Sequence, residues 1–80
     1  MSNSFRPGAL VRHAGKLHME FPATDSSGRF LEAAYNELHA WVSVEPGQLG
    51  LCVGRINDAW NVVLFGEEFV RMLYIDIEAV

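Results

Sequence analysis

The last third of the chain constrains the fold most, because it has the pattern of consecutive strands joined by tight turns. Residues 49–56, 60–65 and 69–74 are rich in β-branched and aromatic residues, which favour strands. An Asn-Asp pair at 57–58 and a Gly-Glu-Glu run at 66–68 separate them, and these residue types are typical of turns. The segment therefore predicts a three-stranded antiparallel meander.

Two features of this segment indicate a curved, closed sheet. Gly50 and Gly54 fall inside the first strand, where glycine usually marks a bulge or a sharp bend. Residues 74–76 predict one 3₁₀ turn, and residues 77–80 predict a short closing strand. This is the pattern of a small barrel.

Both faces of the predicted meander are apolar. Trp60, Val62 and Leu64 share one face of the central strand, and we expect them to point into the core. The opposite face, taken as a possible partner surface, comprises Val63, Phe65, Val70, Met72 and Tyr74. A small barrel has only one interior, so we expect the insertion described next or another copy of the chain to cover that surface. We therefore expect a homodimer or a larger assembly.

The N-terminal half predicts three further strands at residues 9–13, 17–21 and 41–44. Residues 29–40 form an insertion between the last two. Its apolar residues recur at helical spacing and include alanines, which predicts a short helix. The alternative is a long strand or loop that leads into residues 41–44.

Four blocks of the sequence resemble small phage-encoded SH3-like barrel proteins. PGALVR at 7–12, GLCV at 50–53, NVVLF at 61–65 and IDIEAV at 75–80 are similar, in this order, to the segments PGDLV, GxIGIVxxV, VxVLW and xLEVI of that family. The resemblance implies an all-β SH3-like small barrel of five to six strands, with a short helix in an insertion and residues 1–80 as one domain. It implies no particular activity, and the region before residue 46 is longer than a minimal barrel needs.

Composition limits the classes of partner. The formal net charge is −4 and the six lysines and arginines are scattered, which disfavours a nucleic-acid binder. Half of the 80 residues are apolar, so some apolar surface should remain for self-association or a protein partner. No run approaches the roughly 20 apolar residues of a membrane span, and no leader peptide is evident. We expect a cytoplasmic protein, of a cell or of an infected host.

The sequence contains no recognisable catalytic or cofactor motif. His13, His18 and Glu20 form the one conceivable zinc site, but solvated surface histidines fit the pattern better. The adjacent Glu67 and Glu68 should point apart, which disfavours shared acid–base chemistry. We therefore expect no enzyme activity, no cofactor and no metal.

Cys52 and five aromatic residues remain to be interpreted. Cys52 lies in an apolar strand and is expected to be a small buried hydrophobe. The aromatic residues either line a peptide groove or fill the core; they are Tyr35, Trp41, Trp60, Phe69 and Tyr74.

The leading hypothesis is a non-enzymatic interaction or assembly module of phage type. The alternative is a nucleic-acid-associated accessory barrel, which the acidic charge disfavours.

Overall fold

The computed structural model describes residues 5–31 and 41–80, and these residues form two antiparallel sheets. In chain order the elements are β1 (Leu10–His13), β2 (Met19–Pro22), β3 (Trp41–Val44), β4 (Leu49–Arg55), β5 (Trp60–Phe65), β6 (Glu68–Leu73), the 3₁₀ turn η3 (Tyr74–Asp76) and β7 (Ile77–Ala79). The mainly-β prediction is confirmed, and every predicted strand begins and ends within two residues of an observed one. The predicted helix lies outside the described residues, except for residues 29–31, which are not helical.

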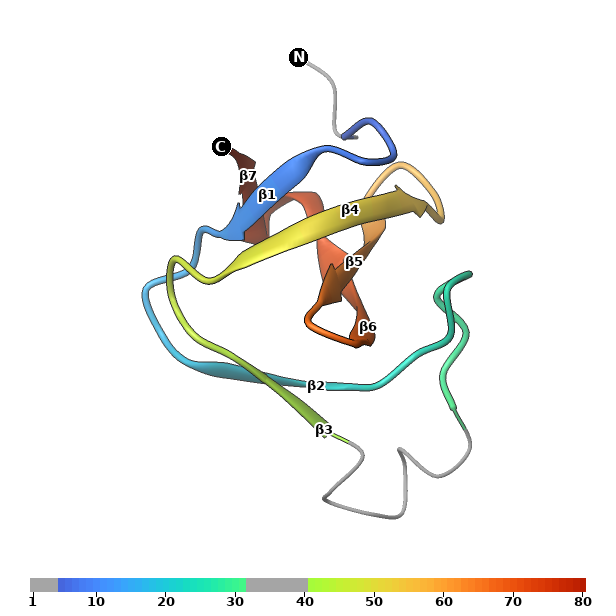
Figure 1. Ribbon diagram of the computed structural model, residues 1–80, viewed down its shortest axis with the longest axis horizontal. Helices are drawn as coiled ribbons and strands as arrows, with labels where there is room; N and C mark the ends of the chain where they lie inside the picture. Colours follow the sequence, from blue (N-terminus) through green and yellow to red (C-terminus); the bar gives the residue numbers. More distant parts are fainter. Residues whose placement is uncertain (1–4, 32–40) are drawn as a thin grey trace.

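The larger sheet has five strands in the order β6-β5-β4-β1-β7. Strands β4, β5 and β6 form the predicted meander, and β1 lies between β4 and β7 (Figure 1). Strands β2 and β3 form a separate two-stranded ribbon. A backbone hydrogen bond joins the segment that follows β2 to the larger sheet: Thr24 N donates to the Phe69 carbonyl oxygen of β6 at 2.8 Å.

The two glycines of β4 have separate structural roles. The β4–β5 register shifts between Cys52 and Gly54, so the predicted irregularity is present. Gly50 instead permits a close approach, because a Cβ atom there would lie 2.7 Å from the ring of Phe65 and 2.8 Å from Val63. The bare backbone of Gly50 thus provides the room for the Phe65 ring.

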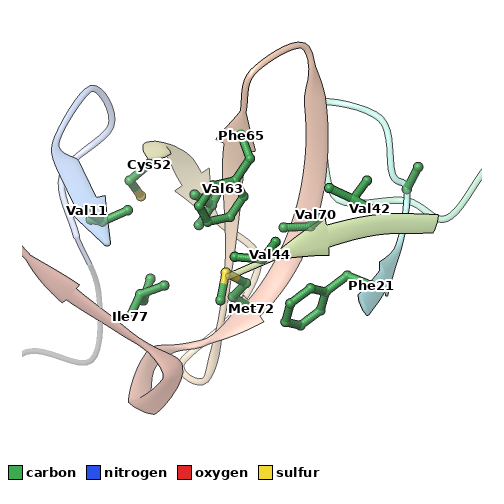
Figure 2. Packing of buried hydrophobic residues seen from close by; sticks show 11 residues of the cluster. Val11, Phe21, Val42, Val44, Cys52, Val63, Phe65, Val70, Met72 and Ile77 are labelled. Atoms are coloured by element: carbon green, nitrogen blue, oxygen red, sulfur yellow. The ribbon is translucent and has the colours of Figure 1, made fainter. Parts of the chain in front are cut away.

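One hydrophobic core joins the two sheets. The larger sheet contributes Val11, Cys52, Val63, Phe65, Val70, Met72 and Ile77, and the ribbon with the residue after it contributes Phe21, Ala23, Val42 and Val44. Figure 2 shows these side chains meeting between the sheets. Packing of the ribbon against the meander therefore supplies the second layer that a single sheet lacks.

The expected orientation of the meander was wrong. Val63, Phe65, Val70 and Met72, expected to be a partner surface, are at most 4% exposed and belong to the core. Only Tyr74 of that set is exposed, at 37%. The physical reason is that the β2–β3 ribbon covers this face, so no second copy is needed to bury it.

Candidate interaction surfaces

A row of apolar side chains crosses the outer face of the five-stranded sheet. Leu10 on β1 pairs with Leu51 on β4, and Leu51 pairs with Leu64 on β5. Leu64 in turn pairs with Phe69 on β6, while Val80 donates its amide hydrogen to the Leu10 carbonyl. We name these five residues the outer row. Their side chains face away from the core because they alternate with core residues along each strand.

The outer row is open to solvent toward the β1 side of the sheet. Leu10 is 47% exposed, Leu51 40% and Val80 62%, whereas Leu64 and Phe69 are half-buried. Leu49, 54% exposed, extends the patch along β4. Large apolar side chains gathered in this way, unlike isolated ones, mark an interaction surface.

One ion pair borders the outer row. Arg12 Nε donates to Glu78 Oε1 at 2.6 Å, and the two residues are register partners on β1 and β7. Both side chains are about half exposed, so the pair adds little stability. Its two charges cancel, which leaves this part of the surface neutral on a chain of net charge −4.

A loop of the chain itself covers part of the other half of the outer face. Asp25 Oδ1 accepts hydrogen bonds from Ser27 N, Ser27 Oγ and Arg29 N, which closes a tight loop and lowers the pKa of the Asp25 carboxyl. Gly28 has a φ of 85°, and a Cβ atom there would lie within 3 Å of Val62 and Ile56. The loop therefore packs on Val62, which is 2% exposed although it is on the outer face.

Three residues form an aromatic–arginine cluster beside this loop. The guanidinium carbon of Arg71 lies 4.8 Å from the centre of the Phe30 ring and 4.9 Å from that of Trp60. Thr24 pairs with both Phe30 and Phe69, which places Phe30 over the β5–β6 surface. Each contact is in the range of a cation–π interaction.

Of the aromatic residues that the sequence singles out, Trp60 is the one in this cluster. Its position is fixed by the turn before β5, where Asn57 Oδ1 accepts hydrogen bonds from Ala59 N at 2.9 Å and Trp60 N at 3.0 Å. Trp41 instead pairs with Pro22 on the ribbon. Tyr35 lies outside the described residues.

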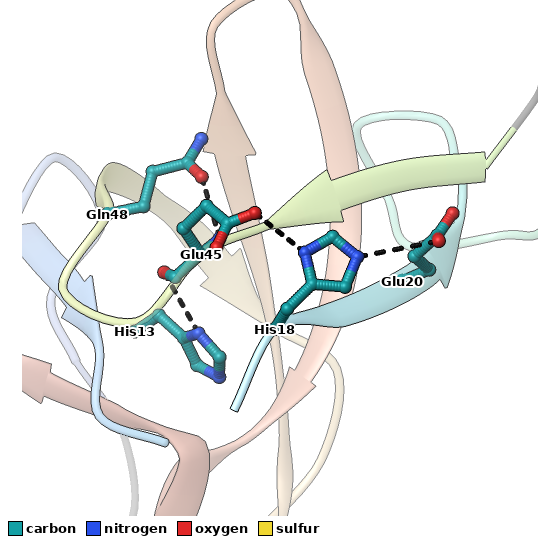
Figure 3. A network of polar contacts seen from close by, with 5 residues as sticks. All are labelled: His13, His18, Glu20, Glu45 and Gln48. Carbon is teal, nitrogen blue, oxygen red and sulfur yellow. Dashed lines mark hydrogen bonds and ion pairs between the residues drawn. The ribbon is translucent and has the colours of Figure 1, made fainter. Parts of the chain in front are cut away.

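His18 forms a second polar cluster with two carboxylates. Its Nδ1 lies 2.7 Å from Glu45 Oε1, and its Nε2 lies 3.4 Å from Glu20 Oε2 (Figure 3). The hydrogen bond with Glu45, and then the one with Glu20, raise the pKa of His18 above 6.5. The prediction that His18 and Glu20 share a polar site is correct, but His13 is not part of that site.

His13 is buried, so the expectation of a surface histidine was wrong. It is 1% exposed, and its Nδ1 lies 3.1 Å from the Glu45 carbonyl oxygen (Figure 3). Since a carbonyl only accepts, Nδ1 carries the proton. Nε2 is buried with no hydrogen-bond partner, and it lies so close to Gly15 that a Cβ atom there would be 2.6 Å away.

The described residues offer no metal centre and no reactive thiol. Within residues 5–31 and 41–80, no three His, Cys, Asp or Glu side chains are grouped so that they could hold a metal ion. Cys52 is fully buried as predicted, and burial raises the pKa of its thiol. Glu67 and Glu68 are exposed at the β5–β6 turn. In the same residues, no helix is long and apolar enough to cross a membrane.

No protein-family model, no curated protein and no solved structure matches this chain. The two surfaces of the outer face, the outer row and the aromatic–arginine cluster, are therefore the features on which a function can be based. Sequence reasoning singled out Trp60 of the cluster and Phe69 of the outer row as aromatic candidates, but it did not identify Arg71 or the row as a whole. The predicted meander contained a signal for part of the row. When its three strands are paired, the apolar residues Leu51, Leu64 and Phe69 face one another across neighbouring strands.

Proposed function

We propose that this protein is a non-enzymatic interaction and assembly module, built as an SH3-like barrel of phage type, that associates with a second copy through the outer row. The architecture has three supports besides the sequence blocks. Strands β4, β5 and β6 follow one another as a meander, one 3₁₀ turn precedes the last strand, and β7 pairs with β1.

The outer row carries the proposal. Five apolar residues on neighbouring chain segments lie side by side, and three of them are at least 40% exposed. Burying exposed apolar area contributes about 25 cal/mol per Å². A sheet face of this kind is most simply buried against another flat apolar face.

Charge favours a second copy as the occupant. The outer row is uncharged, and its border has one positive and one negative residue, Arg12 and Glu78. A two-fold axis brings the row against itself and can place Arg12 of each copy near Glu78 of the other. A strongly charged partner would find no complementary charge along the outer row itself.

The size of the patch sets the strength of the association. Five segments spaced by about 4.8 Å span only about 19 Å across the sheet. A standard interface buries about 800 Å² on each partner, which a patch this narrow does not reach. The dimer is therefore weak, with a Kd of about 10–100 μM, and its formation depends on concentration.

Sedimentation equilibrium between about 5 and 500 μM tests the proposal. We expect a reversible monomer–dimer equilibrium for the parent protein. Leu51→Glu and Val80→Glu should each weaken it at least tenfold, because they place a charge in the row. Leu17→Glu is the matched control: Leu17 is 76% exposed outside the row, and its substitution should leave the equilibrium unchanged.

Two results would contradict the proposal. One is a monomer at every concentration, and the other is an equal loss of association in all three variants. A gel shift with DNA and RNA separates the nucleic-acid alternative, for which a shift that disappears as salt is raised is expected. For the assembly module we expect no shift.

A further inference from the structure

Arg71 is a half-buried cation that forms no ion pair with a carboxylate of residues 5–31 or 41–80. Its Nε atom is buried and makes no hydrogen bond. In the part of the chain that the structure describes, the ion pairs involve Arg12 and His18 but not Arg71. Thus the exposed Arg12 is paired while the more buried Arg71 is not, although a charge removed from water has the greater need of a partner.

The two aromatic rings offset part of this cost and hold the guanidinium in place. The Phe30 and Trp60 contacts at 4.8 and 4.9 Å are electrostatically favourable, and stacking restricts the plane of the guanidinium group. The N–H groups of arginine point outward in that plane. Arg71 as a whole is only half-buried, so a ligand in solution can reach this edge.

The rings are positioned by the chain itself and need no ligand to order them. The Asp25 loop and the Thr24–Phe30 pairing fix Phe30, and the Asn57 turn fixes Trp60. A site that is arranged before binding avoids the entropic cost of ordering its side chains. Within the described residues, the Asp25 carboxylate is held by hydrogen bonds of the loop and forms no ion pair with Arg71.

We propose that the aromatic–arginine cluster is a binding site for a carboxylate carried by an apolar peptide segment. A carboxylate matches the guanidinium edge with two parallel hydrogen bonds. The surroundings favour an apolar flank on the ligand, because half-buried Leu73 pairs with Trp60 on this face and exposed Ile56 lies against the Gly28 loop. The net charge of −4 disfavours a polyanion, whereas a single carboxylate meets only the local positive charge. This site uses residues other than the outer row and goes beyond the proposed self-association.

Nuclear magnetic resonance titration with three dipeptide probes tests the inference on the unmodified protein. The probes are N-acetyl-Leu-Leu with a free C-terminus, N-acetyl-Glu-Leu-amide and the neutral N-acetyl-Gln-Leu-amide. Up to about 10 mM, which saturates a site with a Kd of about 1 mM, we expect the two carboxylates to shift the Arg71 Nε–H and Trp60 indole N–H signals. The neutral probe should bind at least tenfold more weakly. Tighter binding of N-acetyl-Leu-Leu would identify a chain terminus as the source of the carboxylate. Tighter binding of N-acetyl-Glu-Leu-amide would identify an acidic side chain.

Two substitutions and a control complete the test. Arg71→Gln should abolish the difference between the charged and neutral probes, and Arg71→Lys should restore little of it because lysine lacks the planar fork. Arg6→Gln makes the same change in net charge at an exposed residue near the N-terminus and should have no effect. Circular dichroism shows whether each variant is folded. The titration of the unmodified protein tests the inference even if a variant does not fold.

Three outcomes would overturn the inference. The first is an absence of shifts at Arg71 and Trp60 with either carboxylate, and the second is equal binding of the glutamine probe. The third is tighter binding of phenyl phosphate or of a thymidine oligonucleotide than of the carboxylates, which would assign the cluster to phosphate or nucleic acid.

Discussion

Individual polar residues owe their environments to partners far away in the sequence. His13 lies with Val11 on the core-facing side of β1, and its ring Nδ1 donates to the carbonyl oxygen of Glu45, 32 residues away. Ala9 and Val11 share this strand face with His13, but the partner at residue 45 is not visible in the local sequence, and the sequence suggested a surface residue. His18, only five residues later, remains exposed and gains its carboxylate neighbours through the β2–β3 ribbon.

The first prediction at the residue scale concerns the titration of His18. Its pKa is raised in the folded protein by hydrogen bonds to Glu45 and Glu20. A raised folded pKa stabilises the fold at pH values below the unfolded pKa of about 6.5. That contribution is lost as the pH rises through the folded pKa. Proton NMR of the ring signals, in the folded protein and in urea, measures both values.

Glu45→Gln and Glu67→Gln provide the comparison for His18. Glu45→Gln should lower the folded pKa of His18 toward its ordinary value and reduce the gain in stability at acidic pH. Glu67 is exposed at the β5–β6 turn, outside the His18 cluster, and its substitution should leave the pKa of His18 in place. An unchanged pKa in the Glu45 variant would mean that the contact shown in Figure 3 is not maintained in solution.

At the scale of elements, local signals predicted the strands but not the faces they bury. The turns at 57–58 and 66–68 and the glycines of β4 act over a few residues, so the sequence locates them. Both faces of β5 are apolar, and alternation alone cannot choose between them. The choice is made by the β2–β3 ribbon, which covers the Val63 and Phe65 face.

The same limitation affected the candidate sites. Trp60 was recognised as an aromatic candidate, whereas Arg71 was not, because its significance depends on cross-strand neighbours. Val62 pairs with Arg71 and Trp60 pairs with Leu73, so Arg71 lies diagonally across from Trp60. Phe30 reaches the cluster through the pairing of Thr24 with Phe69, which no sequence period reveals.

A pair of substitutions in β5 tests which face is buried. Phe65 is 4% exposed in the core, and Phe65→Ala should cost about 3–5 kcal/mol of unfolding free energy. Leu64 is half-buried on the outer face, and Leu64→Ala should cost only about 1 kcal/mol. Urea denaturation followed by circular dichroism compares them. If Leu64→Ala lowered the unfolding free energy more than Phe65→Ala, the Trp60, Val62 and Leu64 face of β5 would point into the core, as the sequence suggested.

At the scale of the whole molecule, charge and apolar surface are separated. The chain has a net charge of −4, yet the outer row is uncharged and its border pair is neutral. Two copies that meet through this face therefore bring together apolar surface that attracts and net charges that repel. The balance between the two sets how the association responds to salt.

We therefore expect dimerisation to strengthen as salt is raised, which is the last prediction. Between about 50 mM and 500 mM NaCl the Debye length falls from about 14 Å to about 4 Å, so repulsion between the two copies is screened while apolar burial is retained. Sedimentation equilibrium should show a several-fold lower Kd at the higher salt. The double variant Glu67→Gln, Glu68→Gln reduces the net charge from −4 to −2 and should respond less to salt. An association that weakens with salt would instead mean that ion pairs such as Arg12 with the other copy's Glu78, and not the outer row, hold the copies together.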